Sequence, residues 1–598
     1  MENQQLGMKF RVVHSLKSDL QKALTPFEDS RNYRSFLSTA YGSVTTGYIL
    51  QFVGAVIVLL FGIIFYRWRQ RSQTGPKYWP IIGSMCVLSG NYDQMHDWIV
   101  HLSQSSRTFR IRMPFRRQYY CTVDQANVKH LLDTNSINYR KGHGYFKRVE
   151  VLVGDRDLHA SYLMRRWTAS EYSHSTTADM GAEALKKGVC TIARILSQVA
   201  FEAGIVDIQE LFRRASLDAV GKVALGLDFA SLPNNLQTDM PRDHMEFSTA
   251  LDSATEIVMK RFVDPLWELK RYFNIGEEAV LAEKMKVLND FIYNIISDRK
   301  CELEHFHGQM YDLAQAYRAT AEGTPYNTRT NDLVSKYLSL TMKDKDEKTY
   351  VPETDVVLRH IVMNFMLGTR DATATTLTWF IYMMSKNPTM AHKLYEELLD
   401  FHTRRRSPRD SPLTQVWSGD WDLEAFTFVM NARLRDYARL LTSESLHELP
   451  YLHACITETL RLYPVVPLDP MDIEANDILP EGYTLKGGKG NLMFLSPYAL
   501  ARVPAIWGPD AATFNPQRWI HGGKFMPESE FKFVTFQAGL YTCNLRDVIY
   551  QNCKVAAAIL GRFFEFVYGG PLNHQPQYRM TSTLLVKNGL KVYPRLRD

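Results

Sequence analysis

One cysteine in this sequence stands in a setting that suits chemistry. In the segment FKFVTFQAGLYTCNLRD, residues 531–547, Cys543 follows a glycine turn at Gly539 and precedes a helix-like run. The N–H dipoles at a helix N-terminus lower the pKa of a nearby thiol, and the thiolate is the form that binds metals or acts as a nucleophile. The other cysteines are widely spaced and form no CxxC pair, which argues against a disulfide framework or a zinc site: Cys86, Cys121, Cys190, Cys301, Cys455 and Cys553. We therefore interpret Cys543 as a candidate ligand or nucleophile.

Charged side chains precede this segment in two further motifs. In ELPYLHACITETLRLYP, Glu458 and Arg461 are spaced so that they share one face of a helix and can form an ion pair. Arg518 follows in the proline-fixed turn FNPQRW, residues 514–519. Taken alone, the pair of Glu458 and Arg461 is typical of an ordinary surface ion pair, which contributes little energy.

A long buried helix must run through the domain to position these groups. The segment TDVVLRHIVMNFMLGTRDATATTLTWFIYMMSKNP, residues 354–388, has no internal proline, and a helix can begin at Thr354 and end before Pro388. Apolar residues lie nearly all round it, which predicts burial. A polar cluster interrupts it: Thr369, Arg370, Asp371, Thr373, Thr375 and Thr376. Because unpaired buried polar groups are costly, this interruption indicates a site.

The composition is that of a large globular protein. The chain has 598 residues, of which 45% are hydrophobic, and a net charge of +6. We find no dense basic stripe with interleaved aromatic residues, so nucleic-acid binding is not indicated. Helical patterns dominate, while Asn588 and Gly589 between two apolar runs predict a β-hairpin near the C-terminus. The coarse class is a helix-rich chain with small β elements.

The N-terminal part contains a predicted membrane anchor. The segment GYILQFVGAVIVLLFGIIFY, residues 47–66, has no charged side chain, and about 20 helical residues span the roughly 30 Å core of a bilayer. Arg67, Arg69, Arg71 and Lys77 follow it, so the positive-inside rule places the C-terminal side in the cytoplasm. We expect an extension at residues 1–46, the anchor at 47–66, a basic and proline-rich hinge at 67–84 and a catalytic domain at 85–598.

The motifs occur in a characteristic order. A long helix with a polar break is followed by a Glu-x-x-Arg helix, a Phe-x-Pro-x-Arg turn, and Phe536-x-x-Gly539 ahead of Cys543. In this order the chain resembles the cytochrome P450 family of haem-thiolate monooxygenases over essentially everything after residue 47. The resemblance implies one large, mostly α domain with a small β portion, preceded by a transmembrane helix. It also implies a single-pass protein of the endoplasmic reticulum membrane with its catalytic domain in the cytoplasm.

The resemblance assigns roles around the cofactor, which would be haem b. Cys543 would be its axial thiolate ligand, and thiolate ligation favours O–O cleavage. Phe536 would pack near the sulfur, and Gly539 would permit the tight turn beside the porphyrin. Arg165, in LMRRWTASEYS, matches the arginine that binds a haem propionate.

The same resemblance makes the charged motifs one unit. Glu458, Arg461 and Arg518 match the buried triad that locks the ligand loop to the core. A buried triad is tolerable only when fully paired, because the loss of one member leaves an uncompensated charge.

The long-helix motif departs from the family pattern. Asp371 matches the acid of the family's proton relay, but Ala372 stands in place of the threonine that helps to deliver protons during oxygen activation. Thr373 is rotated by about 100° from that position, whereas Thr369 lies one turn earlier on the same face as Ala372. We hypothesise that Thr369 supplies the missing hydroxyl, which makes Asp371, Thr369 and Thr373 the candidate catalytic residues.

Three further departures concern the haem. Tyr541 replaces an arginine that pairs with a propionate, and a phenol brings no charge. Leu545 replaces a glycine after the cysteine, and its bulk would cost about 1–3 kcal/mol in a tightly packed site. Ser161 replaces a tryptophan that hydrogen-bonds a propionate.

A more specific resemblance is to plant-type long-chain fatty-acid ω-hydroxylases. It is carried by residues 261–281, 364–388 and 506–519. It implies insertion of one oxygen atom into the terminal methyl of a fatty acid, with electrons from NADPH through a membrane-bound reductase. The expected pocket is an apolar tunnel lined by the polar break, by Val465–Val466 and by the turn at Lys587–Asn588.

Two alternatives remain open at this point. One is a haem-thiolate isomerase of lipid hydroperoxides, which needs no oxygen activation and can dispense with the threonine. The other is a non-catalytic relative that keeps the fold but binds haem weakly. Dependence on NADPH and a reductase separates the first alternative from a monooxygenase, and a haem spectrum separates the second.

Overall fold

The computed structural model describes residues 75–154, 175–232, 241–317, 332–343, 355–406, 423–571 and 574–597, together with Gly54, Ile57 and Gly62. The chain divides into two compact units, residues 1–73 and 74–598. Apart from these three isolated residues, the predicted anchor at 47–66 lies outside the described residues. Among the described residues, no helix combines the length with the hydropathy that a bilayer crossing requires.

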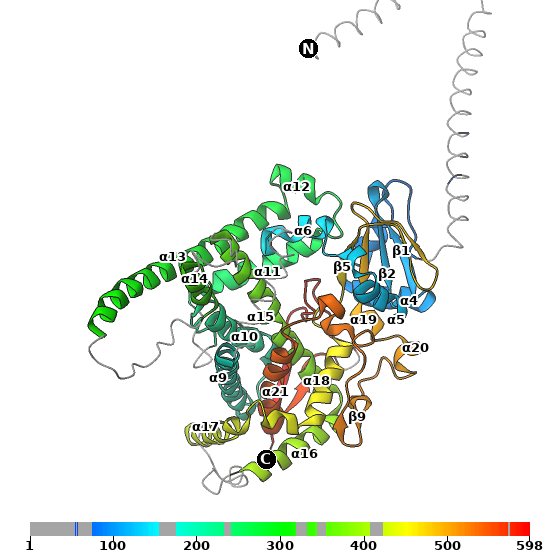
Figure 1. Ribbon diagram of the computed structural model, residues 1–598. Coiled ribbons are helices and arrows are strands. Elements are labelled where there is room, and N and C mark those ends of the chain that lie inside the picture. Colours follow the sequence, from blue (N-terminus) through cyan, green and yellow to red (C-terminus); the bar gives the residue numbers. More distant parts are fainter. Residues whose placement is uncertain are drawn as a thin grey trace, which may run out of the picture. The chain divides into compact units, whose positions relative to one another are not determined.

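Helices make up most of the second unit, as the sequence predicts (Figure 1). The helices are α3 (Met85–Gly90), α4 (Met95–Ser105), α5 (Gln125–Lys129), α6 (His143–Val153), α9 (Ser175–Phe201), α10 (Ile208–Leu225), α11 (Arg242–Lys260), α12 (Trp267–Phe273), α13 (Glu277–Tyr317), α14 (Leu333–Lys343), α15 (Asp355–Lys386), α16 (Pro388–Arg405), α17 (Leu423–Leu440), α18 (Pro450–Leu462), α19 (Pro497–Leu500), α20 (Pro504–Trp507) and α21 (Arg546–Phe563).

The β structure is small and is divided among several sheets. The largest sheet has the order β1-β2-β8-β5-β3, in which β2 and β8 are parallel and the other pairs antiparallel. A second sheet has the order β11-β12-β4, and β6-β7 and β9-β10 are two-stranded. The strands are β1 (Thr108–Arg112), β2 (Gln118–Thr122), β3 (Tyr139–Arg140), β4 (Val206–Asp207), β5 (Asp469–Ile473), β6 (Asp477–Ile478), β7 (Thr484–Leu485), β8 (Leu492–Leu495), β9 (Ile520–His521), β10 (Lys524–Phe525), β11 (Phe564–Tyr568) and β12 (Lys591–Leu596).

Helix α15 is the long helix that the sequence predicts at residues 354–388. It crosses the middle of the domain and packs against α10, α18 and α21 (Figure 1). Its side chains from Val357 to Met384 are nearly all buried, which agrees with the apolar pattern on every face. Gly368 is an exception, because it is exposed. The helix thus carries the polar break of residues 369–376 into the core.

The predicted C-terminal hairpin is wrong, although its turn forms. Asn588 and Gly589 both adopt positive φ, at 64° and 77°, as an Asn-Gly turn requires. However, β12 pairs with β11 and β4 rather than with the residues before the turn. A hydrogen bond to Asp207 explains why the chain after the turn runs toward β4. The carboxylate of Asp207 accepts this bond from the backbone N–H of Leu590 at 3.1 Å. The turn therefore delivers β12 to strands that are distant in sequence.

Candidate functional site

The turn before α21 presents Cys543 in a defined geometry. The amide of Cys543 donates to the carbonyl of Phe536 at 2.8 Å, which closes the turn. Helix α21 begins just beyond it at Arg546, so the thiol lies ahead of a helix N-terminus, where N–H dipoles favour a thiolate. Phe536 is buried and its ring lies 5.4 Å from that of Tyr550 on α21.

Cys543 differs from the buried cysteines in its environment. It is partly exposed, whereas Cys121, Cys455 and Cys553 are buried. Burial raises the pKa of Cys121 and of Cys553 to about 12. Those thiols stay protonated at neutral pH and are inert in the core. Cys543 is therefore partly accessible to a cofactor and lies in a turn of fixed geometry, as a metal ligand requires.

Gly539 is required by its backbone conformation and by a close neighbour. Its φ is +58°, and a Cβ at this position would lie 2.5 Å from the carbonyl oxygen of Leu132. A residue with a side chain would therefore meet both the strain of the left-handed region and a clash with fixed backbone. The close approach that the structure shows at Gly539 is to Leu132.

We expect Gly539→Ala to displace the ligand turn. Gly276 is a matched control, because its φ is +62° and, apart from its chain neighbours, no atom of the described residues lies within 4 Å of the place that a Cβ would take there. Gly276→Ala should cost only the backbone strain, about 1–2 kcal/mol, while Gly539→Ala should cost more and reduce haem content. Urea unfolding and the haem absorbance of both variants check this, and equal effects would contradict the steric argument.

Side-chain hydrogen bonds fasten the ligand turn to the rest of the core. The hydroxyl of Thr535 donates to the carbonyl of Leu460 on α18 at 3.0 Å. The amide group of Gln537 donates to Asp469 at 2.8 Å. The hydroxyl of Tyr541 donates to the carbonyl of Tyr139 at 3.1 Å. The residue that replaces the family's arginine thus ties the turn to β3.

Glu458, Arg461 and Arg518 lie together in the structure. The guanidinium of Arg461 forms two hydrogen bonds of 2.8 Å with the Glu458 carboxylate, and the two side chains are 1% and 0% exposed. Arg518 approaches the same carboxylate at 3.5 Å and pairs with Asp510 at 2.8 Å. The pair of Glu458 and Arg461 is therefore a buried salt bridge and not a surface one.

Two partners of Glu458 were not predicted from the sequence. The indole N–H of Trp519 donates to one carboxylate oxygen at 2.9 Å, and the backbone N–H of Asn515 donates to the other at 2.9 Å. Both residues belong to the motif FNPQRW, so they lie close to Arg518 in the sequence. With these donors both oxygens of Glu458 are satisfied, which makes the buried charge tolerable.

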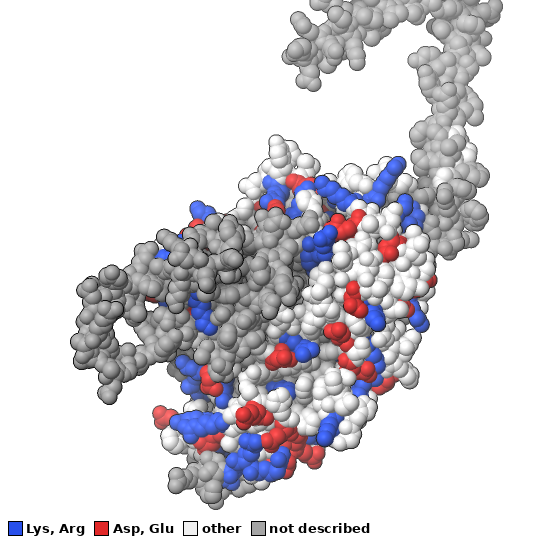
Figure 2. Space-filling view, viewed as in Figure 1, with Lys and Arg blue, Asp and Glu red and all other residues white. Residues whose placement is uncertain are grey.

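The molecular surface offers a contrast to this buried cluster. Figure 2 shows blue and red side chains interspersed over the lower part of the visible face. Arg404 and Asp400, one turn apart on α16, form such a pair at 2.9 Å, with side chains 54% and 66% exposed. Exposed pairs of this kind add little stability.

The polar break of α15 is organised around an ion pair between neighbours in sequence. The Nε of Arg370 donates to one carboxylate oxygen of Asp371 at 2.8 Å, and the terminal nitrogen Nη2 of Arg370 donates to the other oxygen at 3.1 Å. Both side chains are buried. Adjacent helix positions do not ordinarily face each other, so the guanidinium must reach round to meet the carboxylate. Both oxygens of Asp371 are thereby engaged.

The other residues of the break are also buried. The hydroxyl of Thr369 donates to the carbonyl of Phe365 one turn earlier, at 2.7 Å. Thr373 and Ala372 are both 4% exposed. Apart from its chain neighbours and the backbone of α15 itself, no atom of the described residues lies within 4 Å of the place that a Cβ on Gly368 would take.

The three segments expected to line a pocket are only partly brought together. Leu584 joins Val465 to α15, because its amide donates to the carbonyl of Val465 at 3.0 Å and its carbonyl accepts from Trp379 at 2.6 Å, but Trp379 lies beyond the polar break of residues 369–376. Val465 is buried and Val466 is 36% exposed. Lys587 and Asn588 instead line a separate cleft.

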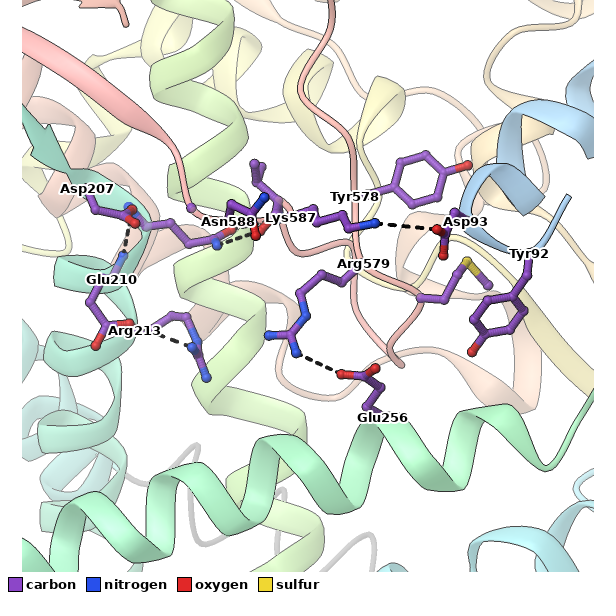
Figure 3. A pocket seen from close by; sticks show the side chains of 14 residues that line it. Tyr92, Asp93, Asp207, Glu210, Arg213, Glu256, Tyr578, Arg579, Lys587 and Asn588 are labelled. Atoms are coloured by element: carbon purple, nitrogen blue, oxygen red, sulfur yellow. Dashed lines mark hydrogen bonds and ion pairs between the residues drawn. The ribbon is translucent and has the colours of Figure 1, made fainter. Parts of the chain in front are cut away.

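This polar cleft opens between α10, α11 and the segment 578–589, and has a volume of about 490 Å³. Charged side chains dominate its lining, as Figure 3 shows, with Arg579 pairing with Glu256 at 2.7 Å and Lys587 with Asp93 at 3.4 Å. The apolar lining expected at Lys587–Asn588 is therefore wrong, because charged groups from α10, α11 and the N-terminal part of the domain meet there.

Arg165 and Ser161 lie outside the described residues, so their predicted roles stay predictions. The haem that the resemblance implies fits the described residues on the thiol side. Cys543 is a ligand of the right chemistry in a turn that its own backbone hydrogen bond fixes. On the propionate side, the phenol of Tyr541 is bonded to a protein carbonyl in place of the family's arginine.

Comparisons with known proteins agree with this geometry. The sequence profile described as Cytochrome P450 matches residues 74–416 and 431–544. The chain is 40% identical to "Cytochrome P450 704B1" of Arabidopsis thaliana, over 89% of this chain and 96% of that protein. It is 34% identical to "Cytochrome P450 704C1" of Pinus taeda, over 89% and 94%, and 29% identical to "Cytochrome P450 86B1" of Arabidopsis thaliana, over 91% and 89%. The chain therefore belongs to the cytochrome P450 family and is an oxidoreductase of the monooxygenase class.

Proposed function

We propose that this cytochrome P450 hydroxylates the terminal methyl of a long-chain fatty acid, with haem b bound through the Cys543 thiolate. Haem with a thiolate ligand supplies the chemistry of oxygen activation. The observation that carries the proposal is the ligand turn, in which Cys543 precedes α21 and Thr535 is bonded to the same helix, α18, that holds Glu458 and Arg461. The substrate class rests on the resemblance of residues 261–281, 364–388 and 506–519 to fatty-acid ω-hydroxylases.

Separate residues of the chain bind the cofactor and deliver protons. Cys543 holds the cofactor, with Phe536 and Gly539 shaping its turn and Arg165 binding a propionate. Asp371 supplies the ionisable group on α15 for proton delivery, with Thr369 and Thr373 beside it.

The charged triad holds the ligand turn, and two further components supply electrons and attachment to the membrane. Glu458, Arg461 and Arg518 keep the turn fixed to the core. NADPH-cytochrome reductase delivers the electrons, and the span at residues 47–66 anchors the protein in the endoplasmic reticulum membrane with residues 85–598 in the cytoplasm.

The direct test is turnover with a defined substrate. Full-length protein with reductase, NADPH and a long-chain fatty acid should yield the ω-hydroxy acid, with one NADPH consumed per coupled product. A product hydroxylated at another carbon would contradict the regiochemistry, and the absence of any hydroxylated acid from haem-loaded protein would contradict the substrate class.

A second function is favoured by the hydrogen bonds of the polar break on α15. Ala372 brings no hydroxyl, the proton of Thr369 is donated to Phe365, and Asp371 is held by Arg370. Rearrangement of a fatty-acid hydroperoxide needs no proton delivery to oxygen, so this arrangement suits a hydroperoxide isomerase. Conversion of a fatty-acid hydroperoxide without NADPH or reductase would identify that activity.

The Thr369 hypothesis gives a specific prediction about coupling. Thr369→Val removes the hydroxyl but keeps the shape, and we expect a several-fold lower ratio of product to NADPH consumed, with the balance appearing as peroxide. Ala372→Thr, which restores the family's hydroxyl, should raise that ratio and make Thr369→Val harmless in the double variant. An unchanged ratio in Thr369→Val would show that this hydroxyl takes no part.

A further inference from the structure

The polar cleft is connected to the interior of the domain by one of its lining residues. Arg213 on α10 lies at the cleft, where it pairs with Glu210 at 3.7 Å (Figure 3). The same guanidinium also forms a salt bridge with Asp252 on α11. Arg213 thus connects the charged side chains that line the cleft with Asp252, which is mostly enclosed by the protein.

Asp252 passes this connection on to the polar break of α15. Its other carboxylate oxygen accepts from Arg370 at 2.8 Å. The donor is the same nitrogen that binds Asp371 at 3.1 Å. Four charged side chains from three helices therefore form one continuous series: Arg213, Asp252, Arg370 and Asp371. Two positive and two negative groups alternate, so that each inner member is shared by two partners.

The middle of the series is charged despite its burial. Burial works against ionisation of Asp252, but Arg370 and Arg213 outweigh it and hold the pKa of Asp252 below its ordinary value. Burial likewise opposes the charge of Arg370, and Asp371 and Asp252 more than reverse this, so the pKa of Arg370 is raised. A buried guanidinium of this kind depends on its anions.

Arg370 has no further support among the described residues. Its side chain is 2% exposed, and its remaining terminal nitrogen has no hydrogen-bond partner in the described part of the chain. Asp252 and Asp371 therefore compete for one cation. If one carboxylate withdraws, the guanidinium can serve only the other, which it must then hold more firmly.

We propose that Asp252 is a positioning residue for oxygen activation, which acts through Arg370 to set how firmly the carboxylate of Asp371 is held. This inference rests on the proposed function for the role of Asp371, but the arrangement itself is testable without turnover. By sharing Arg370, Asp252 loosens the hold of the guanidinium on the carboxylate of Asp371. Arg213 at the polar cleft balances the charge of Asp252.

A double-mutant cycle on stability tests the coupling. Asp252→Asn leaves Arg370 paired with Asp371, and Asp371→Asn leaves it paired with Asp252, so each single variant keeps one anion. The double variant leaves Arg370 with none, and its loss in urea midpoint should exceed the sum of the single losses. If the double variant does not fold, adding Arg370→Gln should restore folded protein. Additive losses, or no restoration, would overturn the proposal.

Turnover provides the second arm. Haem-loaded Asp252→Asn should give several-fold less product per NADPH than the parent protein, because the guanidinium of Arg370 then has Asp371 as its only carboxylate partner. Glu256→Gln is the matched control, since Glu256 lies one turn along α11 and pairs with Arg579 at the same cleft. Asp252→Glu, which keeps the charge, should recover part of the coupling.

The two arms separate the possible failures. Equal amounts of product per NADPH for Asp252→Asn and Glu256→Gln, or no recovery in Asp252→Glu, would contradict the positioning role even if the parent protein hydroxylates fatty acids. A parent protein that forms no hydroxylated acid would contradict the proposed function, while the stability cycle would still decide whether Asp252 and Asp371 act through Arg370.

Discussion

Replacing Cys543 with serine should abolish the thiolate signature of the reduced carbon monoxide complex and reduce product formation to background. The thiolate is the ligand form, and a serine hydroxyl does not ionise at neutral pH to take its place. The turn itself should survive, because it is closed by the backbone bond between the Cys543 amide and the Phe536 carbonyl. The measurement is the carbon monoxide difference spectrum of purified protein, with product analysis on the same sample.

Cys301→Ser serves as the control for this substitution. Cys301 is an exposed cysteine on α13, so its loss should leave the spectrum and the turnover unchanged. If Cys543→Ser retained the thiolate spectrum, another cysteine would be the ligand and the central assignment would be wrong.

Glu458→Gln should produce the largest loss of stability among single substitutions at the site. It leaves the guanidinium of Arg461 buried beside a neutral amide, and the cost of an uncompensated buried charge is about 3–5 kcal/mol. The amide nitrogen also cannot accept a hydrogen bond, whereas both carboxylate oxygens now accept one at 2.9 Å, from Trp519 and from Asn515. Because Thr535 is bonded to the carbonyl of Leu460 on the same helix, haem retention should fall together with the unfolding free energy.

The exposed pair on α16 gives the comparison. Asp400→Asn removes one member of the Arg404–Asp400 pair and should change the unfolding free energy little, because exposed pairs contribute little. Urea unfolding followed by tryptophan fluorescence measures both variants. Equal losses would show that the triad is not the buried lock that its geometry indicates.

Several features of the site could be predicted because their signals are local in sequence. The apolar pattern of α15, the spacing of Glu458 and Arg461, and the glycine before Cys543 each concern a few neighbouring residues. Trp519, a partner of Glu458, also lies next to Arg518 in the sequence. It could not be predicted, because a tryptophan beside an arginine forms no recognisable pattern.

Other features could not be predicted because they depend on tertiary contacts. Asp252 on α11 meets Arg370 on α15 through a salt bridge between residues 118 apart in sequence, and nothing in its own segment distinguishes it from other acidic helix residues. The predicted hairpin failed for a similar reason, since the partners of β12 lie at residues 206–207 and 564–568. The polar lining at Lys587 likewise comes from α10 and α11.

The two departures on either side of Cys543 acquire structural roles. The hydroxyl of Tyr541 binds the carbonyl of Tyr139, so it contributes to the fixation of the turn. Leu545 is partly buried and packs against buried hydrophobic side chains of the domain core. Each of the two residues therefore has contacts within the protein that help to hold the ligand turn in place.

The most direct test of the central claim is the absorption spectrum of the purified, reduced full-length protein under carbon monoxide. A strongly red-shifted Soret band, present in the parent protein and lost in Cys543→Ser, is the result that we predict. A spectrum without haem, or one with haem but without the red shift, would contradict the assignment of Cys543 as the thiolate ligand.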